Sequence, residues 1–139
     1  MALDSNNQMQ IMLIDNDKHI RDSLSLFFRN EQMRFLIFKS AAEGFNALKF
    51  QEIDVVISDY FLPDMDGVSF LKKVKECNPA AARVLMATII SDELKAESNQ
   101  AGIDFFLEKP LTISSLDAVI LGLKNKYQPP DNHGMQNEP

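Results

Sequence analysis

The stretch "DVVISDYFLPDMDG", residues 54–67, decides the fold class because it joins a short apolar run to an acidic loop. The apolar run is rich in β-branched residues and is typical of a strand that is buried on both faces. Asp59 follows the predicted strand directly, and Pro63 and Gly67 mark the segment beyond it as a turn. The pattern predicts a buried strand that presents a carboxylate at its carboxyl end.

Four further segments are short and apolar in the same way, and we expect all five strands to be buried on both faces. They are residues 11–14, 35–38, 83–88 and 105–108. Ser40 and Glu43 form a capping box at the start of the second predicted helix, and Gly102 ends a polar fourth helix. All predicted helices except the fourth carry apolar residues at helical spacing. These residues are Ile20, Leu24, Phe27 and Phe28 in the first helix, Phe45 and Leu48 in the second, Phe70, Leu71 and Val74 in the third, and Ile113, Leu116, Val119, Ile120 and Leu123 in the fifth. We therefore expect an α/β fold, a doubly wound (βα)5 parallel sheet of five strands with helices on both faces.

Composition limits the function classes. The chain has 139 residues, of which 45% are hydrophobic, so a single domain can bury a sizeable core. Its net charge of −6 argues against direct binding of nucleic acid. Cys77 is the only cysteine, and we interpret it as a small buried residue in a reducing compartment. No signal peptide or membrane-spanning apolar run is recognised, so we expect a cytoplasmic protein without membrane contact.

The two ends of the chain are polar and contain little that could be buried. Residues 1–9 are expected to be a disordered tail, and residues 127–139, which contain Pro and Gly, a disordered tail or a linker. The folded domain is therefore expected to span residues 10–126.

Polar side chains lie at the ends of four predicted strands: Asp15, Asp59, Thr88 and Lys109. Since the carboxyl ends of parallel strands meet at one edge of a sheet, these side chains should converge. Clustered carboxylates attract Mg²⁺, whose charge screens the repulsion between a carboxylate nucleophile and a phosphoryl group. A lysine and a hydroxyl can then hold the phosphoryl oxygens. The sequence predicts a site for phosphoryl transfer.

Three motifs resemble the receiver domain of two-component response regulators, a family that includes the chemotaxis regulators. They are "ISDYFLPDMDG" (57–67), "VLMAT" (84–88) and "FFLEKP" (105–110). The resemblance implies a flavodoxin-like fold with strand order 2-1-3-4-5, which the residue pattern alone does not give. It also implies a signalling domain rather than an enzyme, one that at most phosphorylates and dephosphorylates itself.

The resemblance implies that Asp59 accepts a phosphoryl group from a sensor histidine kinase or a phosphotransfer protein. Asp15, Asn16, the carboxylate of Asp59 and the backbone carbonyl of Phe61 would hold Mg²⁺. Asn16 departs from the family, which usually has an acidic residue here, because an amide offers an oxygen ligand but no negative charge. Losing a group that only supports a metal ligand typically weakens binding about tenfold to a hundredfold. We therefore expect weak Mg²⁺ binding and slow phosphorylation.

The resemblance assigns the switch to three further residues. Thr88 and Lys109 would bind the phosphoryl oxygens, and Thr88 would move inward on activation. Phe106 stands where the family often has a tyrosine whose rotamer follows that movement, and it could equally be a core residue. Ile89 and Ile90 are apolar for this loop, and we expect a downstream effector to bind the face around Ile90 and Phe106. The oligomeric state stays open.

The other polar residues near the site are expected to have structural roles. Asp17 is predicted to cap the first helix, although it could instead compensate for Asn16 as a metal ligand. His19 is predicted to face solvent. Asp64 and Asp66 are predicted to be turn and cap residues of the loop after Asp59.

Two alternatives remain open at this stage. Because of Asn16, the chain could be an atypical receiver that docks to partners without phosphorylation. It could also be a haloacid-dehalogenase-type phosphatase with Asp15 as nucleophile and Asp17 as general acid and base, although no acidic pair follows Lys109. A flavodoxin is excluded, because the acidic loop after the first strand would repel a phosphate.

Overall fold

Five parallel strands form a single sheet in the order β2-β1-β3-β4-β5. The computed structural model describes residues 8–20, 22 and 33–126. Its strands are β1 (Met9–Ile14), β2 (Met33–Phe38), β3 (Val55–Asp59), β4 (Ala82–Ala87) and β5 (Phe105–Glu108). The fold class and the strand order implied by the resemblance are confirmed.

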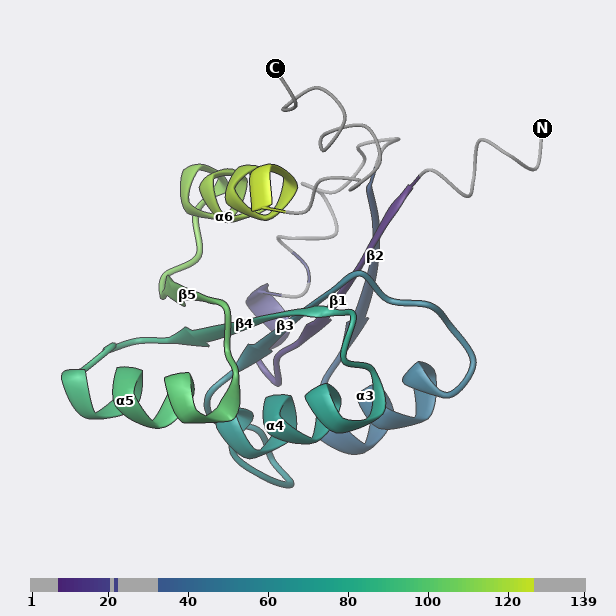
Figure 1. Cartoon of the computed structure of the whole chain (residues 1–139), viewed down its shortest axis with the longest axis horizontal. Helices are drawn as coiled ribbons and strands as arrows, with labels where there is room; N and C mark the ends of the chain where they lie inside the picture. Colours follow the sequence, from purple (N-terminus) through teal and green to yellow (C-terminus); the bar gives the residue numbers. More distant parts are fainter. Residues whose placement is uncertain (1–7, 21, 23–32, 127–139) are drawn as a thin grey trace, which may run out of the picture.

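Helices cover both faces of the sheet, as predicted. Figure 1 shows α3 (Ala41–Leu48), α4 (Gly67–Cys77) and α5 (Asp92–Ala101) side by side on one face, and α6 (Ile113–Lys126) on the other. Residues 18–20 begin a further helix, and Ile20 packs into the same cluster as α6. Leu24, Phe27 and Phe28, which were predicted to continue it, lie outside the described residues.

The alternation of side chains along the strands divides the core into two layers. On the α3–α5 face, Met12, Ile14, Val56 and Leu85 pack against Phe70, Leu71 and Val74 of α4 and their neighbours. On the α6 face, Ile11, Leu13, Ile57 and Met86 pack against Leu116, Val119, Ile120 and Leu123. Successive residues of the three central strands are thus buried alternately on opposite faces, which explains their nearly continuous apolar sequences.

Three expectations need correction. The prediction of strands buried on both faces holds for β1, β3 and β4, but β2 and β5 are the sheet edges and are only partly buried. β1 begins at Met9, which pairs with Met33, so the predicted N-terminal tail is too long at its inner end. Cys77 is exposed, because it is the last residue of α4 and lies beyond the buried face of that helix.

The helix ends follow the predicted signals. The Ser40 hydroxyl caps α3 by accepting from Glu43 N at 3.2 Å, and α5 ends at Gly102 with φ of 79°. The predicted tail 127–139 and most of 1–9 lie outside the described residues. Within the described part of the chain, none of the helices has the length and apolar character needed to cross a membrane.

Candidate phosphoacceptor site

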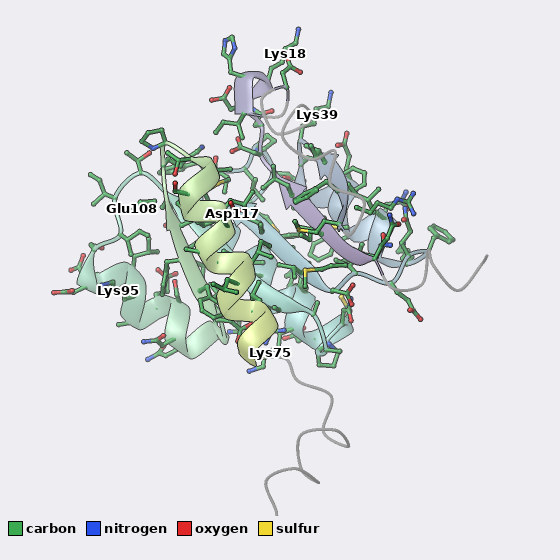
Figure 2. The ribbon with its side chains drawn as sticks, turned by 90° about the horizontal axis from the view of Figure 1, so that it is seen from above. Lys18, Lys39, Lys75, Lys95, Glu108 and Asp117 are labelled. Carbon is green, nitrogen blue, oxygen red and sulfur yellow. The ribbon has the colours of Figure 1, made fainter. Side chains whose placement is uncertain are left out.

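The register of the central strands brings two carboxylates together at the carboxyl edge of the sheet. Ile14 of β1 pairs with Ser58 of β3, so the next residues, Asp15 and Asp59, lie side by side. Figure 2, which looks onto the α6 face of the sheet, labels Lys18 beyond the end of β1 and Lys39 directly after β2, toward the top of the picture. The predicted convergence of the strand ends therefore has a simple cause in the parallel register.

Asp15 is fully buried, and its two carboxylate oxygens have different surroundings. Oδ1 accepts a hydrogen bond from the backbone N–H of Asp17 at 2.8 Å. Oδ2 is buried without a hydrogen-bond partner, and the Lys109 ammonium lies 3.2 Å away in an arrangement suited to an ion pair. A buried carboxylate oxygen with so little coordination favours a cation as its neighbour.

Lys109 links the two carboxylates. Its Nζ lies 3.2 Å from Asp15 Oδ2 and 3.2 Å from Asp59 Oδ2. Its backbone N–H is anchored to the Ala87 carbonyl of β4 at 2.9 Å, so β4 and β5 position it. Burial alone would lower the pKa of Lys109, but the charges of Asp15 and Asp59 outweigh it and hold that pKa above its usual value. The ammonium is therefore charged at neutral pH.

Asp59 is mostly buried, yet its side chain is still reachable from solvent, with a relative accessibility of 11%. Burial, followed by repulsion from Asp15, raises the pKa of Asp59 above its usual value, and Lys109 only partly offsets these effects. A carboxylate that is poorly stabilised in its charged form is a better nucleophile toward an electrophilic phosphorus. Two carboxylates and one ammonium leave the cluster one negative charge in excess.

Thr88 and Lys109 lie next to each other because β4 and β5 are in register. Ala87 pairs with Glu108, and Thr88 and Lys109 are the following residues. Thr88 is exposed and lines an open groove of about 490 Å³ together with Lys109. The other lining residues are Asp17, His19, Ile20, Pro110 and Leu111. The groove leaves room beside Thr88 and Lys109 for a group that approaches from solvent, although Asp15 and Asp59 are not among its lining residues.

The structure also places the expected metal ligands. Asn16 is exposed in the bend after β1, directly beside Asp15. Phe61 lies two residues beyond Asp59, with its side chain 77% exposed and its backbone paired with Asp66 across the loop. Nowhere among the described residues do three or more acidic, histidine or cysteine side chains gather into a metal-binding cluster.

The donor set nevertheless suits a hard divalent cation. Mg²⁺ prefers oxygen ligands and usually keeps several waters, with only one or two carboxylates from the protein. Asp15 and Asp59 provide those two carboxylates, and Asp15 Oδ2, which makes no hydrogen bond of good geometry, has the positively charged Lys109 ammonium 3.2 Å away. The residues therefore fit Mg²⁺, but with less negative charge than an acidic residue at position 16 would give.

The neighbouring polar residues have the structural roles that were expected, with one addition. Asp17 Oδ1 accepts from His19 N at 2.9 Å, so Asp17 caps the helix that starts at residue 18, and His19 is exposed. Asp66 caps α4 by accepting from Ser69 N at 2.8 Å. Asp64 is also a cap, but of α3, a helix that is distant in the sequence.

The residues of the expected effector face are partly covered. Phe106 is half-buried and packs with Leu94 against the core on the α3–α5 face. Ile90 is half-buried, whereas the neighbouring Ile89 is 75% exposed. Phe106 therefore has the packing of a core residue in this structure, while Ile89 supplies the apolar surface.

Comparison with known proteins identifies the family. A family model for the response regulator receiver domain matches residues 11–121. The chain belongs to this family. This membership argues against the haloacid-dehalogenase-type phosphatase. In that phosphatase Asp17 would be the general acid and base, whereas here its side chain caps a helix. The wider classification as a receiver domain of two-component response regulators is confirmed, and nothing found favours the atypical docking module over it.

Individual relatives give the same result for this receiver domain. It is 32% identical over 110 residues to the DNA-binding transcriptional regulator NtrC of Proteus hauseri, covering 79% of this chain and 23% of that protein. It is 26% identical over 109 residues to the transcriptional activator protein PfeR of Pseudomonas aeruginosa, covering 78% of this chain and 35% of that protein. The chain thus spans about a third or less of the length of these curated relatives.

Solved structures show the same fold as this receiver domain. A CheY-like response regulator receiver domain protein from Methanospirillum hungatei is 25% identical, with a TM-score of 0.77 and coverage of 85% of this chain and 95% of that one. A BeF3-activated DrrB receiver domain is 24% identical, with a TM-score of 0.75 and coverage of 85% and 98%.

Two features of the site were missed from the sequence. Gly67 packs so closely on the Asp59 carbonyl that a β-carbon there would overlap it, although only the turn character of glycine was recognised. The hydrogen bonds from Ala41 and Ala42 of α3 to Asp64 were missed because these two residues lie 23 and 22 positions before Asp64 in the sequence. Neither feature has a local sequence signal.

Proposed function

We propose that Asp59 is the phosphoacceptor of this receiver domain and takes its phosphoryl group from a phosphohistidine of a sensor histidine kinase or phosphotransfer protein. In this reaction an oxygen of Asp59 forms a bond to phosphorus while the P–N bond of phosphohistidine breaks. The electron pair of that bond stays with the imidazole nitrogen. The observation that carries the proposal is the placement of Lys109 Nζ at 3.2 Å from both Asp15 and Asp59.

Mg²⁺ would be held by the carboxylates of Asp15 and Asp59, the Asn16 side-chain oxygen and the Phe61 carbonyl. When bound, it supplies positive charge that offsets the repulsion between Asp59 and the incoming phosphoryl group. Lys109 and Thr88 would then bind the phosphoryl oxygens, with the ammonium leaving its ion pair with Asp59. The amide at Asn16 makes the cation weakly bound and the reaction slow, as inferred from its missing charge.

Phosphorylation would be read out by a partner. Thr88 would move inward on activation, and a downstream effector would bind the face around Ile90 and the half-buried Phe106. The exposed Ile89 adds apolar area to this surface. Because the curated relatives are longer and include transcriptional regulators, the receiver domain would control an output domain or a separate effector protein, and nucleic acid would be contacted only by that output.

We also propose residues 9–126 as the receiver domain, one residue longer than expected because β1 begins at Met9, with residues 127–139 as a tail or linker. A cytoplasmic location is part of the proposal. Its support is the free, exposed thiol of Cys77, which suits a reducing compartment.

The proposal is tested by incubating the protein with acetyl phosphate, with and without Mg²⁺, and measuring the phosphoryl group by intact mass spectrometry. The wild type is expected to gain one phosphoryl group only with Mg²⁺, and Asp59→Asn to gain none. Asp117→Asn is the control and should be labelled like the wild type, because Asp117 is an exposed residue of α6 that takes no part in the site. Labelling of Asp59→Asn, or a wild type that is never labelled, would contradict the proposal.

A further inference from the structure

The loop between β3 and α4, residues 60–66, is cross-linked to the start of α3 by Asp64. The N–H of Ala41 donates to Asp64 Oδ1 at 3.0 Å, and the N–H of Ala42 donates to Oδ2 at 2.9 Å. Both oxygens of one carboxylate are therefore used, each on a different backbone N–H. Bonds from backbone N–H groups to an ionised carboxylate are stronger and geometrically better defined than neutral ones.

The backbone N–H groups at the N-terminus of α3 bond to two caps, one local and one remote in the sequence. Glu43 N bonds to the Ser40 hydroxyl at 3.2 Å, and Gly44 N bonds to the Ser40 carbonyl, also at 3.2 Å. The first N–H groups of a helix have no partner within it, and here those of Ala41 and Ala42 go to Asp64. One helix end thus has two caps, of which only Asp64 belongs to another element.

The start of α3 is in turn tied to the strand end that bears Asp15. Phe38, the last residue of β2, accepts a hydrogen bond at its carbonyl from Asp15 N at 3.0 Å. Ala41 follows Phe38 by three residues, across the tight connection from β2 to α3. The backbone of Asp15 and the carboxylate of Asp64 are therefore attached to the same short segment, 38–42.

The other end of this connection is the loop that follows Asp59. Gly67 N donates to the Tyr60 carbonyl at 2.6 Å, and Phe61 pairs with Asp66, so the loop is closed on itself. Because these contacts join the two ends of the loop, a contact at its tip restrains the loop together with its base. Asp64 lies at that tip and joins the loop to the segment that holds Asp15.

The ionisation of Asp64 is consistent with this cross-link. Desolvation acts to raise the pKa of Asp64, but the hydrogen bonds from the backbone N–H groups of Ala41 and Ala42 together outweigh it and hold the pKa below its usual value. The carboxylate therefore stays charged at neutral pH, with both oxygens available as acceptors.

We infer that Asp64 is a positioning residue for the Mg²⁺ site, because it fixes the 60–66 loop, and the Phe61 carbonyl in it, against the loop that carries Asp15. Asp64 does not touch the cation itself. The inference rests on the proposed function, since it takes the Phe61 carbonyl as a metal ligand. Groups that orient metal ligands typically change affinity about tenfold to a hundredfold when they are removed.

Ser40 provides the matched control. Ser40→Ala removes the local cap of α3, whereas Asp64→Ala removes the remote cap and also releases the loop. Asp64→Asn is the conservative variant, because an amide retains one acceptor oxygen for the two N–H groups. Each variant is measured for its thermal midpoint, for the Mg²⁺ concentration that gives half-maximal labelling by acetyl phosphate, and for hydrogen exchange of the Gly67 amide in the metal-free protein.

We expect Ser40→Ala and Asp64→Ala both to lower the thermal midpoint, but only Asp64→Ala to need about tenfold more Mg²⁺. Gly67 should exchange faster in Asp64→Ala than in Ser40→Ala, and Asp64→Asn should lie between wild type and Asp64→Ala. If the wild type is labelled but Asp64→Ala and Ser40→Ala show the same Mg²⁺ dependence, the inference about Asp64 is overturned while the proposed function stands. A wild type that takes no label at any Mg²⁺ concentration would instead overturn the proposed function, and with it the role of Asp64 toward the cation.

Discussion

Asp59 has a charged form that the folded protein accommodates poorly. Burial and the neighbouring Asp15 raise its pKa, and the ammonium of Lys109 compensates only in part. The folded protein therefore binds the Asp59 proton more tightly than the unfolded chain does. It follows that the contribution of Asp59 to the free energy of unfolding falls as pH rises from the ordinary value of 3.8 through the raised folded pKa.

Replacing Asp59 by Asn should therefore stabilise the domain at neutral pH, because the amide cannot acquire the disfavoured charge. We expect a higher thermal midpoint for Asp59→Asn than for wild type at neutral pH, and a difference that shrinks toward pH 3.8. Thermal unfolding followed by circular dichroism at several pH values measures both. Asp117→Asn, an exposed position on α6 (Figure 2), is the control and should show no such trend. A neutral-pH loss of stability in Asp59→Asn would mean that the ion pair with Lys109 outweighs burial.

At the scale of single residues, the sequence predicted which strand-end residues meet but not their environment. Asp15, Asp59 and Lys109 could be placed at one edge because apolar strands end immediately before or close to them. The complete burial of Asp15 and the pairing of Lys109 with both carboxylates depend on three-dimensional distances, which no spacing in the sequence encodes. Cys77 was misplaced for a similar reason, since its exposure depends on where α4 ends.

At the scale of elements, the connection from β3 to α4 is the most tightly constrained part of the site. Gly67, the first residue of α4, lies against the backbone of Asp59 and Tyr60, and a β-carbon would lie 3.0 Å from the carbonyl carbon of Asp59 and from Tyr60 Cα. Backbone atoms cannot rotate away as a flexible side chain can. The entry into α4 and the position of Asp59 are therefore coupled.

Gly67→Ala should accordingly destabilise the domain by about 1–3 kcal/mol, the usual range for overpacking a rigid site. Gly122→Ala is the matched control, because a β-carbon at Gly122 of α6 would lie 3.4 Å from Phe105, an ordinary contact. Alanine also has a higher helix propensity than glycine by about 1 kcal/mol, so this variant should be neutral or stabilising. Urea unfolding of the two variants decides the matter, and equal effects would contradict a specific contact at Gly67.

Element boundaries were predicted well where a local signal exists. Ser40 predicted the start of α3 and Gly102 the end of α5, and the apolar segments predicted the central strands to within about two residues. The partial exposure of β2 and β5 was not predicted, because a short apolar segment has the same sequence pattern in a central strand as in an edge strand. Their edge positions follow only from the complete strand order.

At the scale of the whole molecule, the parallel sheet collects side chains from distant parts of the sequence at one edge. The carboxyl ends of β1 and β3 bring the two carboxylates, and those of β4 and β5 bring Thr88 and Lys109. Asn16 directly follows Asp15 in the sequence and is exposed at this edge. The fold is therefore that of a receiver domain, and we propose that the missing charge of the Asn16 amide weakens its binding of Mg²⁺.

We propose that Asp59 is an active phosphoacceptor whose Mg²⁺ affinity is limited by Asn16. The direct test is the Mg²⁺ dependence of acetyl phosphate labelling, measured side by side for wild type and Asn16→Asp. We predict that both proteins are labelled and that Asn16→Asp reaches half-maximal rate at about a tenth of the Mg²⁺ concentration or less. Superimposable Mg²⁺ curves for the two proteins, or label on Asn16→Asp but never on wild type, would contradict the claim.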